Sequence, residues 1–228
     1  MAAAVEGHPD SERVQNALIV VAHPDDETLW AGGLILSHPR WYVSVASLCR
    51  GSDADRAPKF RRACSALKAT GCRIADTDDG PEQNPLSIES IEETILGLYP
   101  AEHWDRVLTH SLHGEYTRHR RHEEVARAVV DLWARGRLCA DELWMFAYED
   151  EGRRKLPEAI PGADLVVPLT DQIYRKKLEI ITELYGFDTE SWEARATPRV
   201  EAFWRFSEPQ KVAQRFPGGN EDEDSRPL

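Results

Sequence analysis

The stretch that decides the fold is Ala17-Leu18-Ile19-Val20-Val21-Ala22, followed at once by His23-Pro24-Asp25-Asp26-Glu27. A short unbroken run of apolar residues is typical of a strand that is buried on both faces of a parallel sheet. Residues 28–37 then have the pattern of a helix, so the charged residues occupy the turn between a strand and a helix. In open α/β sheets ligands bind beyond the carboxyl ends of the strands, which makes this turn a candidate site.

The alternation of strand and helix continues along the chain. Further strands are predicted over residues 41–48, 72–75, 106–110, 143–148 and 165–169. Helices are predicted over residues 56–70, 87–99 and 122–135, and a long helix is predicted to follow Thr170 and to run through Tyr185. We therefore expect an α/β fold, a Rossmann-like three-layer domain with a mainly parallel sheet.

Composition and charge bound the domain and its class. With 228 residues, 41% hydrophobic and 30% charged, the chain is expected to form a single domain over residues 16–206. Residues 1–15 and 207–228 are polar, and the latter contain the acidic run 221–224, so a flexible N-terminus and a flexible acidic C-terminal tail are predicted. The net charge of −12 argues against binding to nucleic acid.

Several other classes of protein are excluded by missing patterns. The sequence holds no apolar run of the roughly 18 residues that a membrane span needs, and residues 1–15 do not resemble a secretory signal. The four cysteines form no Cys-x-x-Cys pair and are expected to be free thiols, so we expect a cytoplasmic protein. No Gly-x-Gly-x-x-Gly loop follows the first strand, which argues against a nicotinamide or flavin cofactor. Whether the chain forms a homo-oligomer is left open by the sequence.

Two predicted loops hold the residues that can carry chemistry. Residues 23–27 bring one imidazole and three carboxylates to the end of the first strand, and residues 110–122 contain four histidines. Three carboxylates at the end of a buried strand are costly without a cation, which favours a metal site. The alternative is an ordinary helix start, in which Asp25 or Asp26 is the N-cap and His23 has no role.

The two loops together resemble the motifs of a known family. Ala22-His23-Pro24-Asp25-Asp26-Glu27-Thr28-Leu29, followed by Gly32-Gly33, is similar to the signature of the PIG-L/LmbE family of zinc-dependent N-deacetylases. The second motif of that family, Gly-x-Tyr-Gly-His-Pro-Asp-His, resembles residues 114–122 here, which read GEYTRHRRH. This chain has one extra residue after Tyr116 and has Arg120-Arg121 in place of Pro-Asp. The resemblance covers roughly residues 16–206.

The resemblance implies a function and a set of site residues. It implies the metal ligands His23, Asp26 and His122, with zinc as the cofactor and iron(II) as an alternative. It implies the catalytic residues Asp25 as general base, His119 as electrostatic partner or general acid, and Tyr116. The expected reaction is the removal of an N-acetyl or other acyl group from a small N-acetylglucosaminyl-type substrate. Water activated by the metal would attack the amide carbonyl, and a cationic His119 would help to stabilise the oxyanion.

Arginines near these loops predict the character of the substrate. Arg50 follows the second predicted strand and resembles a substrate-contacting arginine of the family, while Arg118 and Arg121 lie in the second loop. Guanidinium groups bind phosphate or carboxylate oxygens in a bidentate manner, so we expect an anionic or heavily hydroxylated group beside the N-acetyl group. The alternative for the two loop arginines is ion pairing with the glutamates at positions 115, 123 and 124.

Alternatives remain open for the ligands and for the function. His110 and His113 compete with His122 for the metal, and Arg121 is expected to lower the pKa of His119. Two histidines and a carboxylate also suit an iron(II) oxygenase, although such sites commonly lie on jelly-roll sheets. The altered second motif leaves a third interpretation, a non-catalytic relative that binds a metal or another ligand.

Overall fold

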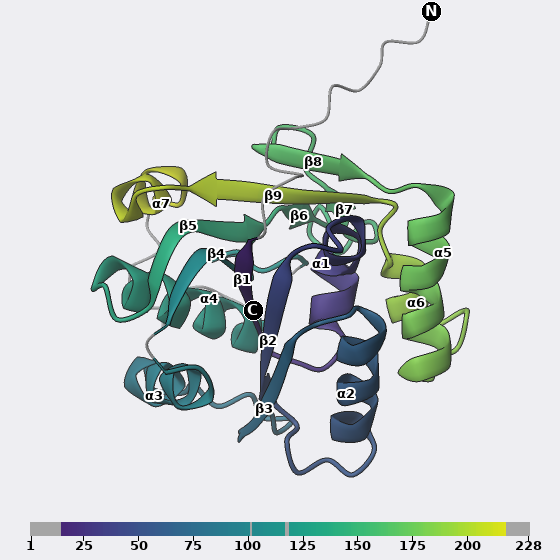
Figure 1. Cartoon of the computed structure of the whole chain (residues 1–228), viewed down its shortest axis with the longest axis horizontal. Coiled ribbons are helices and arrows are strands. Elements are labelled where there is room, and N and C mark those ends of the chain that lie inside the picture. Colours follow the sequence, from purple (N-terminus) through teal and green to yellow (C-terminus); the bar gives the residue numbers. More distant parts are fainter. Residues whose placement is uncertain (1–14, 101, 117–118, 218–228) are drawn as a thin grey trace, which may run out of the picture.

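The computed structural model describes residues 15–100, 102–116 and 119–217, which form a seven-stranded sheet with helices on both faces (Figure 1). The strands of this sheet are β1 (Asn16–Val21), β2 (Tyr42–Cys49), β3 (Gly71–Thr77), β4 (His103–Thr109), β5 (Cys139–Phe146), β8 (Leu165–Pro168) and β9 (Val200–Phe206). The helices are α1 (Asp26–Ser37), α2 (Arg56–Ala66), α3 (Ile88–Leu98), α4 (Arg120–Ala134), α5 (Asp171–Glu179), α6 (Trp192–Ala196) and α7 (Pro209–Arg215). A π-helical turn, Ile180–Leu184, continues α5, and β6 (Tyr148–Glu149) pairs with β7 (Glu158–Ala159) in a separate hairpin.

The order of the strands confirms the predicted α/β fold with a mainly parallel sheet. The order is β3-β2-β1-β4-β5-β9-β8, and β1 to β5 run parallel to their neighbours. Only β9 is antiparallel, both to β5 and to β8, among the described strands of this sheet. Since β1 lies between β2 and β4, the chain leaves β1 and β4 in opposite directions along the sheet. A crevice is expected at the carboxyl ends of these two strands.

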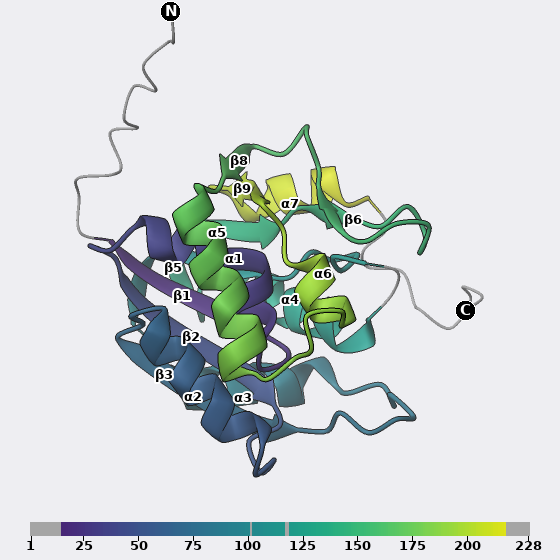
Figure 2. The same ribbon diagram turned by 90° about the vertical axis from the view of Figure 1, so that its right-hand side faces the viewer.

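The sheet and the helices on its two faces form three layers, with a hydrophobic core between each pair of adjacent layers. One core packs α3, α4 and α7 against the sheet, and the other packs α1, α2 and the π-helical turn against its opposite face (Figures 1 and 2). Alternate residues of β1 enter the two cores: Leu18 and Val20 face the first, and Ile19 and Val21 face the second. This double burial is what the apolar run of the first strand predicted.

The helix caps agree with the prediction from the sequence, whereas strand β9 and helix α7 differ from it. Ser87 Oγ and Thr170 Oγ1 accept hydrogen bonds from backbone N–H groups at the starts of α3 and α5. Strand β9 was not predicted. The expected flexible tail does not begin at residue 207, because α7 forms there and buries Val212 and Phe216 in the first core. Residues 1–14 and 218–228 lie outside the described part of the chain.

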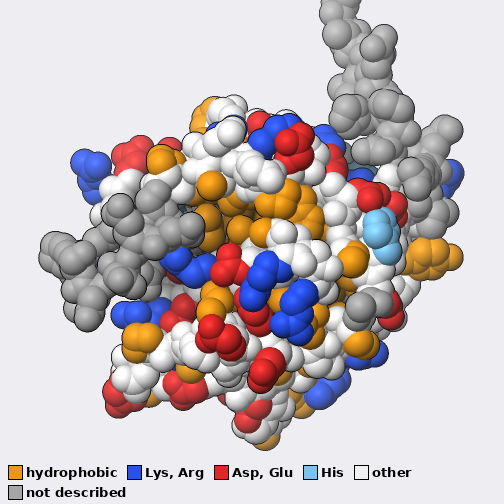
Figure 3. Space-filling model, turned by 90° about the vertical axis from the view of Figure 1, so that its left-hand side faces the viewer, with side chains coloured by type: hydrophobic (Ala, Val, Ile, Leu, Met, Phe, Trp, Pro, Cys, Tyr) orange, Lys and Arg blue, Asp and Glu red, His pale blue; other side chains and the backbone are white. Residues whose placement is uncertain are grey.

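On the side of the molecule where α3 and α7 lie, acidic and basic side chains are interspersed (Figure 3). Every helix in the described ranges is too short or too polar to cross a lipid bilayer.

A buried ion pair joins β9 to α1 and α5. Glu201 accepts hydrogen bonds from the backbone N–H groups of Gly33 at 2.7 Å and Leu34 at 2.6 Å, and from Lys177 Nζ at 2.6 Å. Both charged side chains are fully buried, and burial lowers the pKa of Lys177. A Cβ atom at position 33 would lie 2.9 Å from Glu201 Oε1, so the glycine allows this close approach.

We expect Lys177→Met to lower the free energy of unfolding by about 3–5 kcal/mol, since it leaves the buried carboxylate of Glu201 without a cation. The control is Lys176→Met, because Lys176 forms an exposed ion pair with Glu179 and its loss should cost about 0–1 kcal/mol. Urea unfolding of both variants at pH 7 measures the difference. Equal stabilities of the two variants would show that the buried pair contributes no more than the exposed pair.

Candidate active site

The turn after β1 has a backbone conformation that sets the direction of its carboxylates. Asp25 has φ of 118°, a left-handed conformation that is strained for a residue other than glycine. Its backbone carbonyl accepts the first helical hydrogen bonds of α1, but its side chain makes no capping bond. The side chain of Asp26 instead bonds the backbone N–H of His23 and the indole of Trp30. The capping role that we considered for these aspartates therefore does not describe their side chains.

Three atoms with available lone pairs meet at the end of β1. His23 Nδ1, Asp26 Oδ2 and His122 Nε2 lie 3.3 Å from one another in all three pairings. In a tetrahedral zinc site with bonds of about 2.0–2.1 Å, the ligand atoms are about 3.3–3.4 Å apart. The three side chains therefore fit a bound zinc ion, and we propose them as its ligands. We call these three residues the ligand triad.

Carboxylates outside the ligand triad fix the two imidazoles. His23 Nε2 lies 3.2 Å from Asp79 Oδ1, and His122 Nδ1 lies 2.7 Å from Glu115 Oε2. Since a carboxylate only accepts, each histidine donates its N–H to it and keeps the lone pair of its other nitrogen toward the triad. Although burial alone would lower it, the carboxylates of Asp26 and Glu115 raise the pKa of His122 to about 10, so a zinc ion at the triad would displace a proton from Nε2.

The histidines that compete with His122 are engaged elsewhere. His110 Nε2 accepts the backbone N–H of Ala22 at 3.0 Å, and its Nδ1 donates to Glu115 at 2.9 Å, so both of its nitrogens have partners. His113 is exposed, and its ring contacts Phe216 rather than the ligand triad. The geometry thus favours His122 as the ligand from the second loop.

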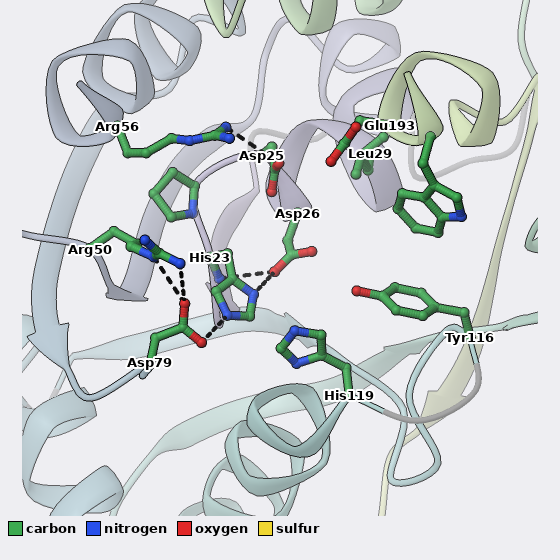
Figure 4. A pocket seen from close by; sticks show the side chains of 12 residues that line it. His23, Asp25, Asp26, Leu29, Arg50, Arg56, Asp79, Tyr116, His119 and Glu193 are labelled. Atoms are coloured by element: carbon green, nitrogen blue, oxygen red, sulfur yellow. Dashed lines mark hydrogen bonds and ion pairs between the residues drawn. The ribbon is translucent and has the colours of Figure 1, made fainter. Parts of the chain in front are cut away.

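An open cavity of about 390 Å³ lies over the ligand triad, within the usual size range of small-molecule sites. Asp25 and His119 lie on either side of His23 and Asp26, and the hydroxyl of Tyr116 points into the same space (Figure 4). Burial and the neighbouring charge of Asp26 raise the pKa of Asp25, and Arg56 Nη1 lies 3.9 Å from Asp25 Oδ2. All three residues that the sequence indicated as catalytic therefore line one cavity.

His119 has an unusual environment. Its Nδ1 is buried and has no hydrogen-bond partner in the part of the chain that the structure describes. Its ring stacks on His122 with centroids 4.4 Å apart. Burial, followed by the nearby His122 and His23, lowers the pKa of His119 to about 3. We expected Arg121 to lower the pKa of His119; the pKa is lowered, and burial is the largest cause.

The three arginines expected to bind substrate have different surroundings. Arg50 lines the cavity, but its Nε and Nη2 contact Asp79 Oδ2 at 2.9 and 2.8 Å, so it supports the partner of His23. Arg121 does not face the cavity, which corrects our expectation. It is buried and contacts Asp78, Glu124 and the Asn84 carbonyl, as the alternative of ion pairing partly anticipated. Arg118 lies outside the described residues.

Sequence reasoning missed several residues that the structure places at the site. The missed residues are Leu29, Arg56, Asp79, Trp192 and Glu193. Asp79 follows the carboxyl end of β3, which places it at the same edge of the sheet as the loops after β1 and β4, but nothing in the sequence pointed to its contact with His23. Trp192 and Glu193 reach the cavity from α6, which the sequence gave no reason to place there.

Comparisons with known proteins show the family of the chain. A family model described as PIG-L, GlcNAc-PI de-N-acetylase, matches residues 18–133. The chain belongs to the PIG-L family. No curated protein sequence matches the chain significantly.

Solved structures share the fold. N,N'-diacetylchitobiose deacetylase from Pyrococcus horikoshii matches with a TM-score of 0.66 and 15% identity, over 86% of this chain and 85% of that chain. GalB, the 4-carboxy-2-hydroxymuconate hydratase from Pseudomonas putida KT2440, matches with a TM-score of 0.56 and 18% identity, over 94% and 92%. The zinc-inhibited form of teicoplanin deacetylase Orf2 matches with a TM-score of 0.53 and 14% identity, over 75% of this chain and 83% of that chain.

Replacing any member of the ligand triad, His23, Asp26 or His122, by alanine should abolish stoichiometric zinc binding, because two ligands do not complete the site. The control is His113→Ala, which removes a histidine of the same loop that does not reach the triad. Metal content of the purified variants, measured by mass spectrometry, gives the result. Full zinc occupancy in His122→Ala would contradict the assignment and would move it to His110.

Proposed function

We propose that the protein is a zinc-dependent amide hydrolase that removes an N-acetyl or related acyl group from a small molecule of the N-acetylglucosaminyl type. The observation that carries the proposal is the ligand triad, whose three atoms lie 3.3 Å apart and whose members His23 and Asp26 line an open cavity together with Asp25. Three protein ligands leave a coordination position open, which is the arrangement of catalytic zinc sites. Membership in the PIG-L family supports the choice of an N-acyl substrate.

The reaction needs a base beside the attacking water. A zinc ion at the ligand triad would polarise the amide carbonyl and lower the pKa of water to about 7. Asp25 is the carboxylate of the turn that is left outside the triad, and its strained backbone holds it in the cavity. It accepts a proton from water as the water oxygen bonds to the carbonyl carbon.

The departing amine and the developing negative charge need donors on the opposite side. The hydroxyl of Tyr116 and the buried Nδ1 of His119, which has no described partner, line the same cavity. A hydrogen bond from either group to the carbonyl oxygen stabilises the charge that develops there. When the C–N bond breaks, the amine nitrogen takes up a proton, and Asp25 supplies the one that it accepted from water. The products are acetate and a free amine.

The test is turnover with a defined metal. We expect the zinc-loaded protein to release amine and acetate from at least one member of a panel of N-acetylglucosaminides, to lose activity with a chelator and to regain it with zinc. Stoichiometric zinc without amine release across the panel would contradict the hydrolase and favour a non-catalytic relative. Turnover that requires iron and 2-oxoglutarate would favour an oxygenase. Hydration of an unsaturated acid without amine release would favour chemistry like that named for GalB.

Asp25→Asn should retain zinc but lower kcat by about 10²-fold or more, since proton transfer by a positioned carboxylate contributes that much. Asp141→Asn is the matched control, because Asp141 is exposed and pairs with His103 away from the cavity. Metal content and amine release are measured on the same preparations. Loss of zinc from the Asp25 variant would mean that Asp25 and Asp26 have exchanged roles.

A further inference from the structure

The segment 78–86, between β3 and α3, forms neither a helix nor a strand. It contains two prolines and a glycine, and each of its residues is exposed or half-buried. Its second residue, Asp79, is nevertheless the carboxylate that lies 3.2 Å from His23 Nε2 (Figure 4). An irregular surface segment therefore supplies the group that orients one member of the ligand triad, and its position depends on contacts with the rest of the protein.

The side chain of Arg121 reaches this segment from the first turn of α4. Its Nε donates to the backbone carbonyl of Asp78 at 2.6 Å, and its Nη2 donates to the backbone carbonyl of Asn84 at 2.8 Å. One guanidinium group thus bonds the backbone on both sides of Asp79. The arginine is 1% exposed, so these hydrogen bonds are shielded from water.

Glu124 adds a further contact from one turn along the same helix. One of its oxygens accepts a hydrogen bond from Arg121 Nη1, and the other accepts the backbone N–H of Leu86 at 3.1 Å. Its carboxylate also balances the charge of the guanidinium group, which is costly to bury alone. The start of α4 therefore holds the segment at three backbone groups, those of Asp78, Asn84 and Leu86.

Two other side chains orient the carboxylate of Asp79 but anchor the segment less firmly. Gln83 Nε2 donates to Asp79 Oδ1 at 3.0 Å, and Gln83 belongs to the segment itself. Arg50 contacts Oδ2, but its side chain is 48% exposed, and an exposed ion pair contributes little. The position of Asp79 beside His23 thus depends mainly on the buried contacts with α4.

The same helix turn carries a member of the ligand triad. His122 follows Arg121 directly, and its Nε2 lies 3.3 Å from His23 Nδ1. Neighbouring residues of α4 therefore supply one ligand and anchor the carboxylate that orients another. The family motif has Pro-Asp where this chain has Arg120-Arg121, so the motif itself does not provide this anchor.

We infer that Arg121 is a positioning residue of the proposed zinc site: it anchors segment 78–86, holds Asp79 against His23 and thereby raises the affinity of the ligand triad for zinc. The inference rests on the proposed function in one respect, because it takes the ligand triad to bind zinc. A carboxylate that accepts the N–H of a ligating histidine fixes the ring and strengthens it as a ligand. Without Arg121, the segment loses two of its three backbone contacts with α4, and Asp79 no longer holds the ring in one orientation.

The test measures zinc affinity by competition with a chromophoric chelator at pH 7, which needs no substrate. We expect Arg121→Gln to weaken zinc binding by about tenfold or more, the range for the loss of such a supporting partner. Arg135→Gln is the matched control: Arg135 caps the other end of α4 and contacts the buried carboxylate of Glu92 in α3, away from the site. Its loss should leave the Kd for zinc unchanged. Unchanged affinity in Arg121→Gln would overturn the inference.

A second variant keeps the test decisive if Arg121→Gln does not fold. Arg121→Lys retains a cation beside Glu124, but its ammonium group lacks the planar fork that bonds the carbonyls of Asp78 and Asn84 together. We expect this variant to unfold cooperatively in urea and to bind zinc more weakly than the unsubstituted protein. Equal zinc affinity in the folded lysine variant would overturn the inference.

A double-mutant cycle shows whether Arg121 acts through Asp79. Asp79→Ala should weaken zinc binding by about 10- to 100-fold, and adding Arg121→Gln should weaken it no further. Additive losses would overturn the inference, because Arg121 would then act by another route. Cobalt(II) in place of zinc gives a spectroscopic check, since its visible absorption depends on the arrangement of its ligands. Arg121→Gln should change this spectrum and Arg135→Gln should not; an unchanged spectrum in the former would also overturn the inference.

The outcomes distinguish this inference from the proposed function. If zinc affinity depends on Arg121 through Asp79 but no amine is released from any N-acetylglucosaminide, the anchor stands and the hydrolase fails. If amine is released but zinc affinity does not depend on Arg121, the hydrolase stands and the anchor fails.

Discussion

The carboxylate of Asp26 is the group on which the rest of the site depends. Its Oδ2 lies 3.3 Å from the imidazoles of His23 and His122 and accepts the backbone N–H of His23 at 2.9 Å. Its Oδ1 accepts the indole N–H of Trp30 at 3.1 Å. One buried anion at the first residue of α1 thus fixes the end of β1, the first turns of α1 and the start of α4. Because burying an anion is costly without cationic partners, this arrangement fits a metal ion and is not explained by packing alone.

Glu115 performs a similar task for the second loop. Its Oε2 accepts from Nδ1 of both His110 and His122, and burial, which would raise its pKa, is outweighed by these imidazoles, so that its pKa is about 2. Through the bond from the Ala22 N–H to His110, the same carboxylate is connected to the end of β1. The loops after β1 and β4 are therefore held together by a network of hydrogen bonds in which the ligand triad is embedded.

The sequence was informative where the signal is local. The apolar run of β1 predicted the sheet, and the charged turn after it predicted His23, Asp25 and Asp26 as site residues. The second motif supplied Tyr116, His119 and His122. Contacts between distant segments carry no such signal: Asp79 meets His23 across 56 positions, and β9 enters the sheet only through its antiparallel partners. Arg121 was misplaced because neighbouring residues of a helix point about 100° apart, so the residue before the triad member His122 turns toward residues 78–84.

The position of α6 has a consequence for how such a chain can diverge. The residues that we propose as metal ligands and proton carriers all lie between β1 and the start of α4, inside the range of the family model. Trp192 and its helix reach the same space from the far end of the chain and take no part in the network around Asp26. Substitutions in this helix can therefore change which molecules are accepted without disturbing the geometry of the chemistry. Related proteins can in this way keep the same reaction and act on different metabolites.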